Sequence, residues 1–305
     1  MNTSVRNLAA LGLLGAALVG CGRGTAETPP APPAKEPAAT GSPSPRASAA
    51  AAGPKPARVP AAPPTMAPGP GGLTPVYTRR AKAGEAAGPG TSKAAEKVVA
   101  LTFDADMTAD QGPRAAQGER FDNPQLIATL RRLKVDATVF MTGRWAEEYP
   151  DQAKSIGVDP RFEIANHSYS HYAFASPCYG LPTVAKPDMA DDVQRAFDAF
   201  RDAGAVNVVP YFRFPGGCYD DAALRALAPT GVTAVQWDVV SGDAFAKDAD
   251  AVAEQVLDGV RPGSLVVMHC TRSAAPVTEQ AIRRIVPELR ARGYRFVKVS
   301  ELMRG

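Results

Sequence analysis

From about residue 96 to the end of the chain, short apolar runs alternate with segments whose apolar residues recur every three or four positions. The apolar runs predict buried strands near 98–103, 136–141, 162–166, 208–213, 232–237, 264–268 and 294–298. The intervening segments predict helices near 123–133, 144–156, 188–203, 220–228, 248–260 and 276–292. Strands that alternate with helices form parallel sheets, because a right-handed helical crossover returns the chain to the same end of the sheet. The pattern therefore predicts an α/β domain over 96–305.

The chain has three histidines, and each follows one of these apolar runs. His167 and His171 are four residues apart, a spacing that brings two imidazoles to one metal if the segment makes a helical turn. Alone this spacing is a weak signal, because two surface or partly buried histidines have it by chance. Asp104 and Asp106 follow another apolar run, and two histidines with a carboxylate are a common catalytic metal set.

Polar residues occur at or just beyond the carboxyl ends of five predicted strands. They are Asp104, His167, Arg213, Asp238 and His269. In a parallel α/β barrel the carboxyl ends of the strands share one face, and active sites are built there. Core packing does not explain five such residues on one rim, so we expect a catalytic site.

The first 21 residues predict export of the protein from the cytoplasm. Arg6 precedes an apolar stretch over 8–19, and Cys21 follows small residues, which resembles the signal peptide and lipobox of a bacterial lipoprotein. A plain cleaved signal peptide or a short membrane anchor is the alternative, although the stretch is short for a membrane span. We expect an extracytoplasmic protein that is anchored to a bacterial membrane through a lipidated Cys21, with inner or outer membrane left open.

Residues 22–95 are predicted to be a disordered linker rich in Ala, Pro and Gly. This stretch has almost no large apolar residues except near 73–77, so it cannot bury enough apolar surface to offset the entropy of ordering. A tether of this kind would let a membrane-anchored domain reach cell-wall material. A spacer with no such role has the same composition.

Five ordered segments give the domain a family resemblance. They are 102–106 (TFDAD), 167–171 (HSYSH), 213–217 (RFPGG), 237–243 (WDVVSGD) and 265–269 (LVVMH). In this order they resemble polysaccharide deacetylases of the NodB-homology class, also called carbohydrate esterase family 4. The resemblance spans about 96–305 and implies a distorted, incomplete (β/α)7-type parallel barrel. It also implies removal of N- or O-linked acetyl groups from sugars with a divalent metal, zinc first and cobalt or nickel as alternatives.

The resemblance also implies roles for individual residues. Hydrolysis of an acetamide needs a polarised carbonyl, an activated water and a proton for the departing amine. His167, His171 and Asp106 would bind the metal. Asp104 would be the general base and His269 the general acid. Arg213 would pair with Asp104 and keep its carboxylate ionised and oriented.

The first segment departs from the family pattern, which commonly has two consecutive aspartates. Ala105 stands at the second position, and Asp106 is the obvious substitute. If the segment is extended, Asp104 and Asp106 point to the same side; if it turns, Asp106 is carried away. Asp104 would then bind the metal itself, with Asp106, Asp110 or a water completing the shell. In a further alternative, metal binding is weak and the domain only binds sugar.

Two later segments also depart from the pattern. Gly216 stands where the family often has a tyrosine, so a wall of the sugar pocket is expected to be missing, whereas the main-chain oxyanion donor would survive. Val240 stands where the family often has an acidic residue. Asp238 and Asp243 are therefore both candidates to orient His269, and we favour Asp238, which is nearer the strand end. An Asp238 that caps the following segment is an equal alternative.

If Cys21 is lipidated, three cysteines remain in an oxidising compartment. The motif positions favour a disulfide between Cys178 and Cys218 that joins two active-site loops. Cys270 follows His269 directly, and the alternatives for the three cysteines are ligation of the metal by a cysteine and free buried thiols.

The functional prediction is a hydrolase that removes acetyl groups from N-acetylated cell-envelope polysaccharide, with peptidoglycan as the expected substrate. A chitin-oligosaccharide or acetyl-xylan deacetylase is the enzymatic alternative. A non-catalytic carbohydrate-binding pseudoenzyme is the alternative from another class, although sugar binding alone needs neither His269 nor Arg213. The net charge of +3, with its basic residues scattered among acids, gives no case for nucleic acid. We expect a monomer.

Overall fold

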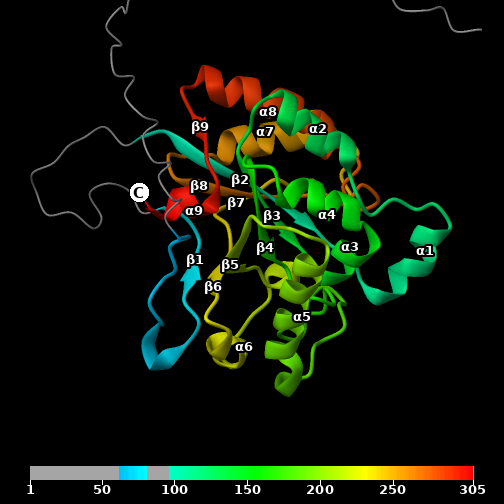
Figure 1. Cartoon of the computed structure of the whole chain (residues 1–305). Coiled ribbons are helices and arrows are strands. Elements are labelled where there is room, and N and C mark those ends of the chain that lie inside the picture. Colours follow the sequence, from blue (N-terminus) through cyan, green and yellow to red (C-terminus); the bar gives the residue numbers. More distant parts are fainter. Residues whose placement is uncertain (1–61, 81–95, 305) are drawn as a thin grey trace, which may run out of the picture. The chain divides into compact units, whose positions relative to one another are not determined.

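The centre of the domain is a curled sheet of parallel strands (Figure 1). The computed structural model describes residues 62–80 and 96–304. In this part of the chain the strand order is β1-β6-β5-β4-β3-β2-β8-β7, and β9 also pairs with β2. The strands are β1 (Val76–Tyr77), β2 (Val98–Ala105), β3 (Ala137–Met141), β4 (Phe162–Asn166), β5 (Val208–Phe212), β6 (Thr233–Val235), β7 (Val239–Val240), β8 (Ser264–His269) and β9 (Arg295–Phe296). The strands at the two ends of this order, β1 and β7, do not pair with each other, so the barrel is incomplete. The predicted fold is confirmed.

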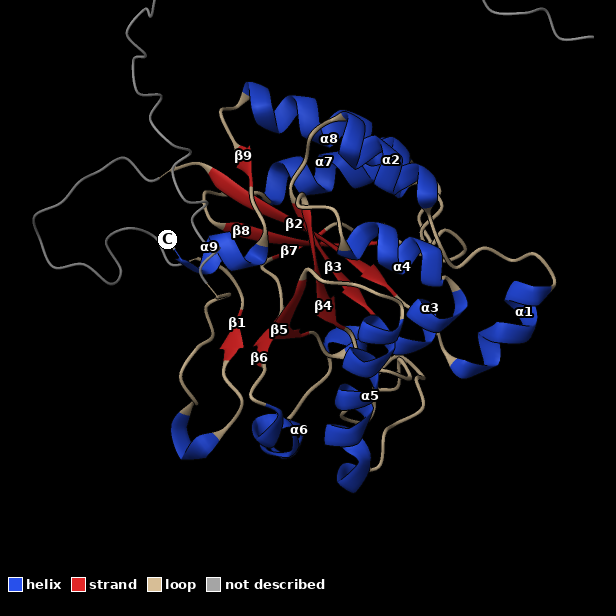
Figure 2. Cartoon of the chain, viewed as in Figure 1, coloured by secondary structure: helices blue, strands red, loops and turns tan. Residues whose placement is uncertain are grey.

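Helices lie around the sheet (Figure 2). They are α1 (Gly112–Ala116), α2 (Pro124–Arg132), α3 (Gly143–Glu148), α4 (Pro150–Gly157), α5 (Met189–Asp202), α6 (Asp221–Leu227), α7 (Ala249–Gly259), α8 (Thr278–Ala291) and α9 (Val299–Arg304). The helix predicted over 144–156 is two helices, because Pro150 disfavours helical geometry at Tyr149, whose ψ is 57°. Among the described helices, none is both long and apolar enough to cross a bilayer.

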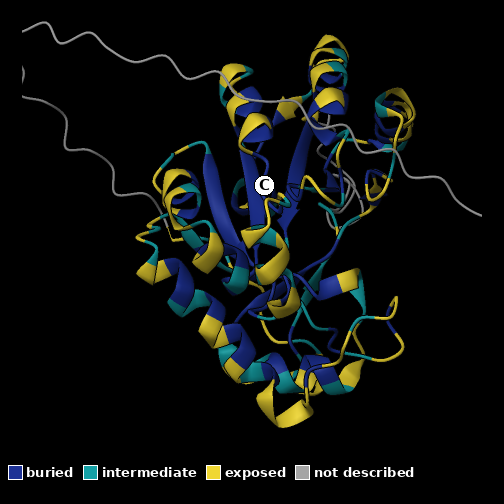
Figure 3. Cartoon of the chain, turned by 90° about the vertical axis from the view of Figure 1, so that its right-hand side faces the viewer, coloured by how far each residue is buried: buried dark blue, intermediate teal, exposed yellow. Residues whose placement is uncertain are grey.

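The two faces of the sheet bury different apolar clusters, and the central strands β2, β3 and β4 are buried at every residue (Figure 3). On β2, Leu101, Phe103 and Ala105 belong to the cluster that includes apolar residues of α2, α7 and α8. Val98 and Ala100 alternate with them and join the second cluster, together with residues of α9. Because successive strand residues point to opposite faces, Asp104 lies on the face of this second cluster. The inner face of the curled sheet therefore carries the polar rim at its carboxyl end.

Residues 62–80 correct part of the linker prediction. This segment runs along β6: β1 pairs with it in parallel, and Thr74 donates its main-chain N–H to the Leu224 carbonyl over 3.1 Å. The Tyr211 hydroxyl donates to the Pro64 carbonyl over 2.8 Å. The apolar island near 73–77 supplies the strand that covers the open edge of β6. The other parts of the predicted linker, and the predicted signal peptide with Cys21, lie outside the described residues.

Candidate active site

Strand register brings the predicted catalytic residues to one end of the sheet. Asp104 is in register with His269 on β8, and the Cys270 N–H donates to the Asp104 carbonyl. Arg213 follows β5, and its N–H donates over 2.8 Å to the carbonyl of Asn166, which precedes His167. Four strands of one sheet, β5, β4, β2 and β8, and the loops after them therefore bring together segments far apart in sequence.

Asp104 and Arg213 form a buried ion pair. The guanidinium Nη1 of Arg213 lies 2.6 Å from Asp104 Oδ1, and its Nε donates to the Val235 carbonyl over 3.2 Å. The guanidinium also lies 3.8 Å from the centre of the Phe140 ring. Burial opposes ionisation of Asp104, but the positive charge of Arg213, with smaller contributions from His167 and His269, outweighs it and lowers the pKa of this carboxyl. Asp104 is thus held ionised, with its Oδ2 left for another partner.

Hydrogen bonds between side chains and the main chain hold the loop that carries His167 and His171. Asn166 Oδ1 accepts from the Ser168 N–H, and Ser168 Oγ accepts from the His171 N–H, each over 2.8 Å. Ser168 and His171 both have positive φ, at 71° and 56°. The helical turn that would bring two histidines together is therefore wrong for this segment. The left-handed residues replace it and leave the two rings 5.0 Å apart between centroids.

The tautomer of His167 suits a metal ligand. Its Nδ1 lies 2.9 Å from the Arg213 carbonyl, which can only accept, so Nδ1 carries the hydrogen and Nε2 keeps a lone pair. Burial lowers the pKa of His167 to about 4, although the charge of Asp104 opposes this change. Burial likewise lowers the pKa of His171. Both imidazoles are neutral at physiological pH, which is the form that binds metal.

Asp106 lies beside this histidine pair. Its Oδ2 is 4.0 Å from His171 Nε2, and its Oδ1 accepts a hydrogen bond from the Thr271 hydroxyl. Ala105, between the two aspartates, belongs to the apolar cluster of Leu101 and Phe103. Asp104 and Asp106 therefore both point to the opposite side of the strand. Asp110 is exposed and accepts from the Thr108 hydroxyl over 2.6 Å. Of the two substitutes weighed for the usual second aspartate, only Asp106 lies near the histidines.

Two neutral imidazoles with a carboxylate nearby are ligand types that bind a divalent metal. No group of three or more His, Cys, Asp or Glu side chains among the described residues is spaced as a finished metal site. The fit therefore rests on the His167 tautomer, on the lowered pKa values and on the position of Asp106. The distance of 3.7 Å between His167 Nε2 and Asp104 Oδ2 leaves the alternative open that Asp104 also binds metal.

His269 has a different environment. Its Nδ1 lies 2.7 Å from Asp243 Oδ1, and its main-chain N–H donates to Asp243 Oδ2 over 2.8 Å. The hydroxyls of Ser241 and Thr278 donate to the same carboxylate. Burial would lower the pKa of His269, but the hydrogen bond and charge of Asp243 outweigh it and raise the pKa to about 9. The side chain is 26% exposed, so its other nitrogen can meet a substrate while still carrying a proton.

Our preference for Asp238 as the residue that orients His269 is wrong. Asp238 Oδ1 accepts from the Leu265 N–H over 2.6 Å, and Oδ2 accepts from the Ser264 hydroxyl over 2.8 Å. Asp238 thus ties the start of β8 to the segment before β7. Because β7 was not predicted, proximity to a strand end was a misleading guide. The alternative residue, Asp243, makes the contact.

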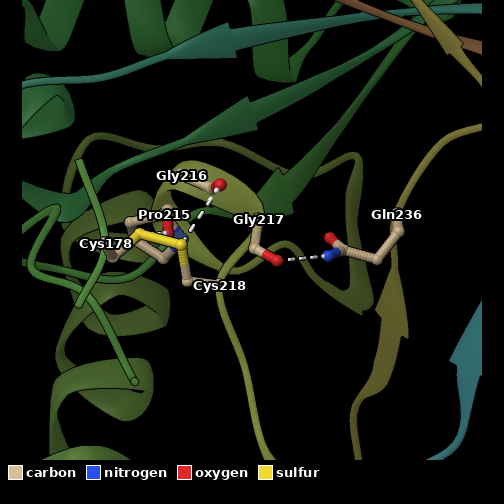
Figure 4. The surroundings of a disulfide bond; sticks show 6 residues. All are labelled: Cys178, Pro215, Gly216, Gly217, Cys218 and Gln236. Carbon is tan, nitrogen blue, oxygen red and sulfur yellow. Dashed lines mark hydrogen bonds between the residues drawn. A yellow bond between two sulfur atoms is a disulfide. The ribbon is translucent and has the colours of Figure 1, made fainter. Parts of the chain in front are cut away.

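The predicted disulfide between Cys178 and Cys218 is confirmed (Figure 4). It joins the loop after His171 to the turn after Arg213, with 6.0 Å between the two Cα atoms. Cys270 is a free, buried thiol, and burial raises its pKa to about 12, so it stays protonated. Cys270 lies in the apolar cluster of Phe103 and Ala105, and the other two cysteines are bonded to each other, which disfavours metal ligation by a cysteine.

Sequence reasoning missed the polar residues that hold the catalytic ones. Thr271 positions Asp106, Thr278 and Ser241 position Asp243, and Gln236 donates its Nε2 hydrogen to the Gly217 carbonyl over 2.9 Å (Figure 4). Ser241 lies inside the segment 237–243, Gln236 and Thr271 lie next to or near recognised segments, and Thr278 has no such signal. Hydroxyl and amide side chains are too common in loops for that signal to select them.

Known proteins resemble this chain in sequence. The family model described as polysaccharide deacetylase matches residues 91–235. A peptidoglycan-N-acetylglucosamine deacetylase of Bacillus cereus is 30% identical over 212 residues, which cover 68% of this chain and 89% of that protein. A chitooligosaccharide deacetylase of Sinorhizobium fredii is 29% identical over 198 residues, which cover 62% of this chain and 86% of that protein.

Solved structures share the fold. The crystal structure of a CE4 family pseudoenzyme from Bacillus anthracis matches with a TM-score of 0.55 and 25% identity, over 68% of this chain and 66% of that one. The family is shown by the Bacillus cereus relative, of which nearly the whole length is matched. The chain belongs to the polysaccharide deacetylase family and is a hydrolase that acts on amide bonds.

Proposed function

We propose that this protein removes N-acetyl groups from cell-envelope polysaccharide in a metal-dependent reaction, with peptidoglycan as the substrate. The observation that carries the proposal is that an ionised carboxylate and a protonated imidazole lie on paired strands. Asp104 is held ionised by Arg213, and His269 is held protonated by Asp243. Amide hydrolysis uses one group in each state, whereas sugar binding alone needs neither.

The metal would be held by His167, His171 and Asp106. When bound, a divalent ion, zinc in our proposal with cobalt or nickel as alternatives, supplies polarisation of the acetamide carbonyl and a lower pKa for water. The Arg213 carbonyl fixes the His167 ring through Nδ1, and Thr271 fixes Asp106. Both contacts keep the donor atoms turned toward the rim.

The protein's own groups would move the protons. Asp104 Oδ2, the oxygen that Arg213 Nη1 does not hold, would accept a proton from the attacking water. His269 would donate its Nε2 proton to the sugar nitrogen as the carbon–nitrogen bond breaks, giving acetate and a free amine. The Nδ1 hydrogen stays on the His269 ring and is donated to Asp243, whose negative charge stabilises the imidazolium before the transfer.

The names of the relatives support two glycans. The Bacillus cereus relative is a peptidoglycan deacetylase and the Sinorhizobium fredii relative a chitooligosaccharide deacetylase, and both share nearly their full length with this chain. We propose peptidoglycan first, because the amino-terminal residues predict an envelope protein. Chitin oligosaccharides are the second candidate.

The envelope location and lipid anchor are part of the proposal. The Cys178–Cys218 disulfide supports the location, because disulfides persist in oxidising compartments outside the cytoplasm. Labelling with a radioactive fatty acid in a bacterial host tests the anchor at Cys21. Incorporation should vanish in Cys21→Ser. A monomer is expected, and its mass in solution checks it.

The proposal is tested by measuring metal content and acetate release together on the full-length protein. The substrates are N-acetylglucosamine oligomers and peptidoglycan glycan fragments, before and after chelation and after metal is restored. About one divalent ion per chain, with acetate release lost on chelation and regained on restoration, is the expected result. Glycan binding without metal and without acetate would instead identify a carbohydrate-binding pseudoenzyme.

A further inference from the structure

Tyr179 is a large aromatic side chain that is almost fully exposed to solvent. It is 90% exposed, the highest value among the exposed large hydrophobic residues in the described part of the chain. Its backbone has φ of 47°, in the left-handed region that non-glycine residues seldom adopt. An exposed ring on a strained backbone gains nothing for folding, so its position calls for another explanation.

The backbone around Tyr179 is fixed in place. Its neighbour Cys178 is buried and bonded to Cys218 (Figure 4). The Leu181 N–H donates to the Cys178 carbonyl over 2.8 Å, and Ala173 forms a bridge with Thr183 across the base of the loop. These contacts therefore fix the backbone from which the Tyr179 ring projects.

This position is beside the catalytic rim. A Cβ atom built on Gly216 would lie 3.3 Å from Tyr179 Cδ2 and 2.6 Å from the Cys178 sulfur. Gly216 is three residues after Arg213, and the loop of Tyr179 begins directly after His171. Gly216 has φ of 64° and no side chain, so the space above this turn is taken by the disulfide and the tyrosine ring.

We propose that Tyr179 is a stacking platform for a pyranose ring of the polysaccharide, in a subsite next to the sugar whose acetyl group is removed. A pyranose has an apolar face of C–H groups and a rim of hydroxyls. Such a face packs on the electron-rich face of an aromatic ring while its hydroxyls stay in water. The disulfide lowers the entropic cost of binding, because the backbone that carries the ring is ordered before the glycan arrives. This inference rests on the proposed glycan substrate.

The test compares Tyr179→Ala, Tyr179→Phe and Val206→Ala in the full-length protein. Val206 is 74% exposed in the connection before β5, at the opposite end of the sheet from the rim, and serves as the control. KM and kcat for acetate release are measured on N-acetylglucosamine oligomers of increasing length. For Tyr179→Ala we expect KM to rise about tenfold for the longer oligomers, with kcat little changed and the shortest oligomers unaffected. Tyr179→Phe keeps the stacking face and should resemble the wild type, as should Val206→Ala.

A KM for Tyr179→Ala that matches the wild type at every length would overturn the proposal. So would a loss that is equal at every length, because it would indicate general damage to the site. Calorimetric binding of the longest oligomer to the same variants separates this inference from the proposed activity. If the wild type binds the oligomer but releases no acetate, the deacetylase proposal fails, and weaker binding by Tyr179→Ala still supports the platform. If the wild type neither binds nor deacetylates these oligomers, both proposals fail.

The double variant Cys178→Ser/Cys218→Ser tests the role of the disulfide in positioning the ring. If circular dichroism shows that it folds, its KM should rise for long oligomers as in Tyr179→Ala. Adding Tyr179→Ala to the double variant should then cause little further change, because both changes remove the same ordered platform. If the rise in KM caused by Tyr179→Ala is as large in the double variant as in the wild type, the disulfide does not act through Tyr179.

Discussion

His167 and His269 lie on the same rim but differ in what holds Nδ1. The Arg213 carbonyl accepts from His167, and burial lowers the pKa of that imidazole to about 4. The Asp243 carboxylate accepts from His269 and raises the pKa to about 9 in spite of burial. A neutral acceptor cannot offset the loss of hydration, whereas a full negative charge can. One residue type thus becomes a metal ligand at one place and a proton donor at the other.

The largest expected effects follow from breaking each side of this comparison separately. His167→Ala should lose both metal and turnover, whereas His269→Ala and Asp104→Asn should lose turnover by about 10³-fold with metal retained. Metal content by mass spectrometry and acetate release on the same samples measure both quantities. Equal metal loss in Asp104→Asn and His167→Ala would reassign Asp104 from base to ligand.

A smaller effect is expected from removing only the charge that raises the His269 pKa. Wild-type activity should fall as pH rises through about 9, where His269 loses its proton. In Asp243→Asn, burial is no longer opposed, so the pKa of His269 falls and the alkaline limb of the profile moves toward neutral pH. We expect kcat to fall about 10²-fold as well.

The matched control for that prediction is Asp238→Asn. Asp238 binds the main chain and hydroxyl of β8 residues and does not contact His269. Its variant should be less stable in urea, because a strand contact is weakened, while the alkaline limb stays where the wild type has it. An alkaline limb that moves in Asp238→Asn and not in Asp243→Asn would reverse the assignment of the orienting carboxylate.

These two aspartates also show what the sequence could and could not predict. The strand ends that place Asp104, Arg213 and His269 on one rim follow from apolar runs, and the seven predicted strands are present. The choice between Asp238 and Asp243 depends on a two-residue strand and on loop hydrogen bonds, which leave no periodic pattern. Such contacts are set by tertiary packing.

The same limit applies to the histidine pair and to the amino-terminal segment. The spacing of His167 and His171 predicted that both rings lie at one site, but it suggested a helical turn. Instead, the side chains of Asn166 and Ser168 stabilise residues in the left-handed conformation. Residues 62–80 have the composition of a linker, and nevertheless Val76 and Tyr77 pair with β6. A short strand at a sheet edge needs few apolar residues of its own.

The smallest expected effect concerns Asp106 on the metal side of the comparison. Asp106→Asn should weaken metal affinity by about 10–100-fold, and Thr271→Val, which removes the hydroxyl bound to Asp106, by about tenfold. Competition with a fluorescent chelator measures both affinities, and Thr108→Val, which frees Asp110 on an exposed turn, is the control. Unchanged affinity in Asp106→Asn would exclude this carboxylate as a ligand.

The most direct test of the opposed roles is an imidazole titration by NMR. Because the chain has three histidines, the ring nitrogens of ¹⁵N-labelled metal-free protein give few signals, and His→Gln variants assign them. We predict that His269 titrates near pH 9, and that His167 stays neutral with its hydrogen on Nδ1 down to about pH 4. A His269 midpoint near 6.5, or a His167 that is protonated at neutral pH, would contradict the account.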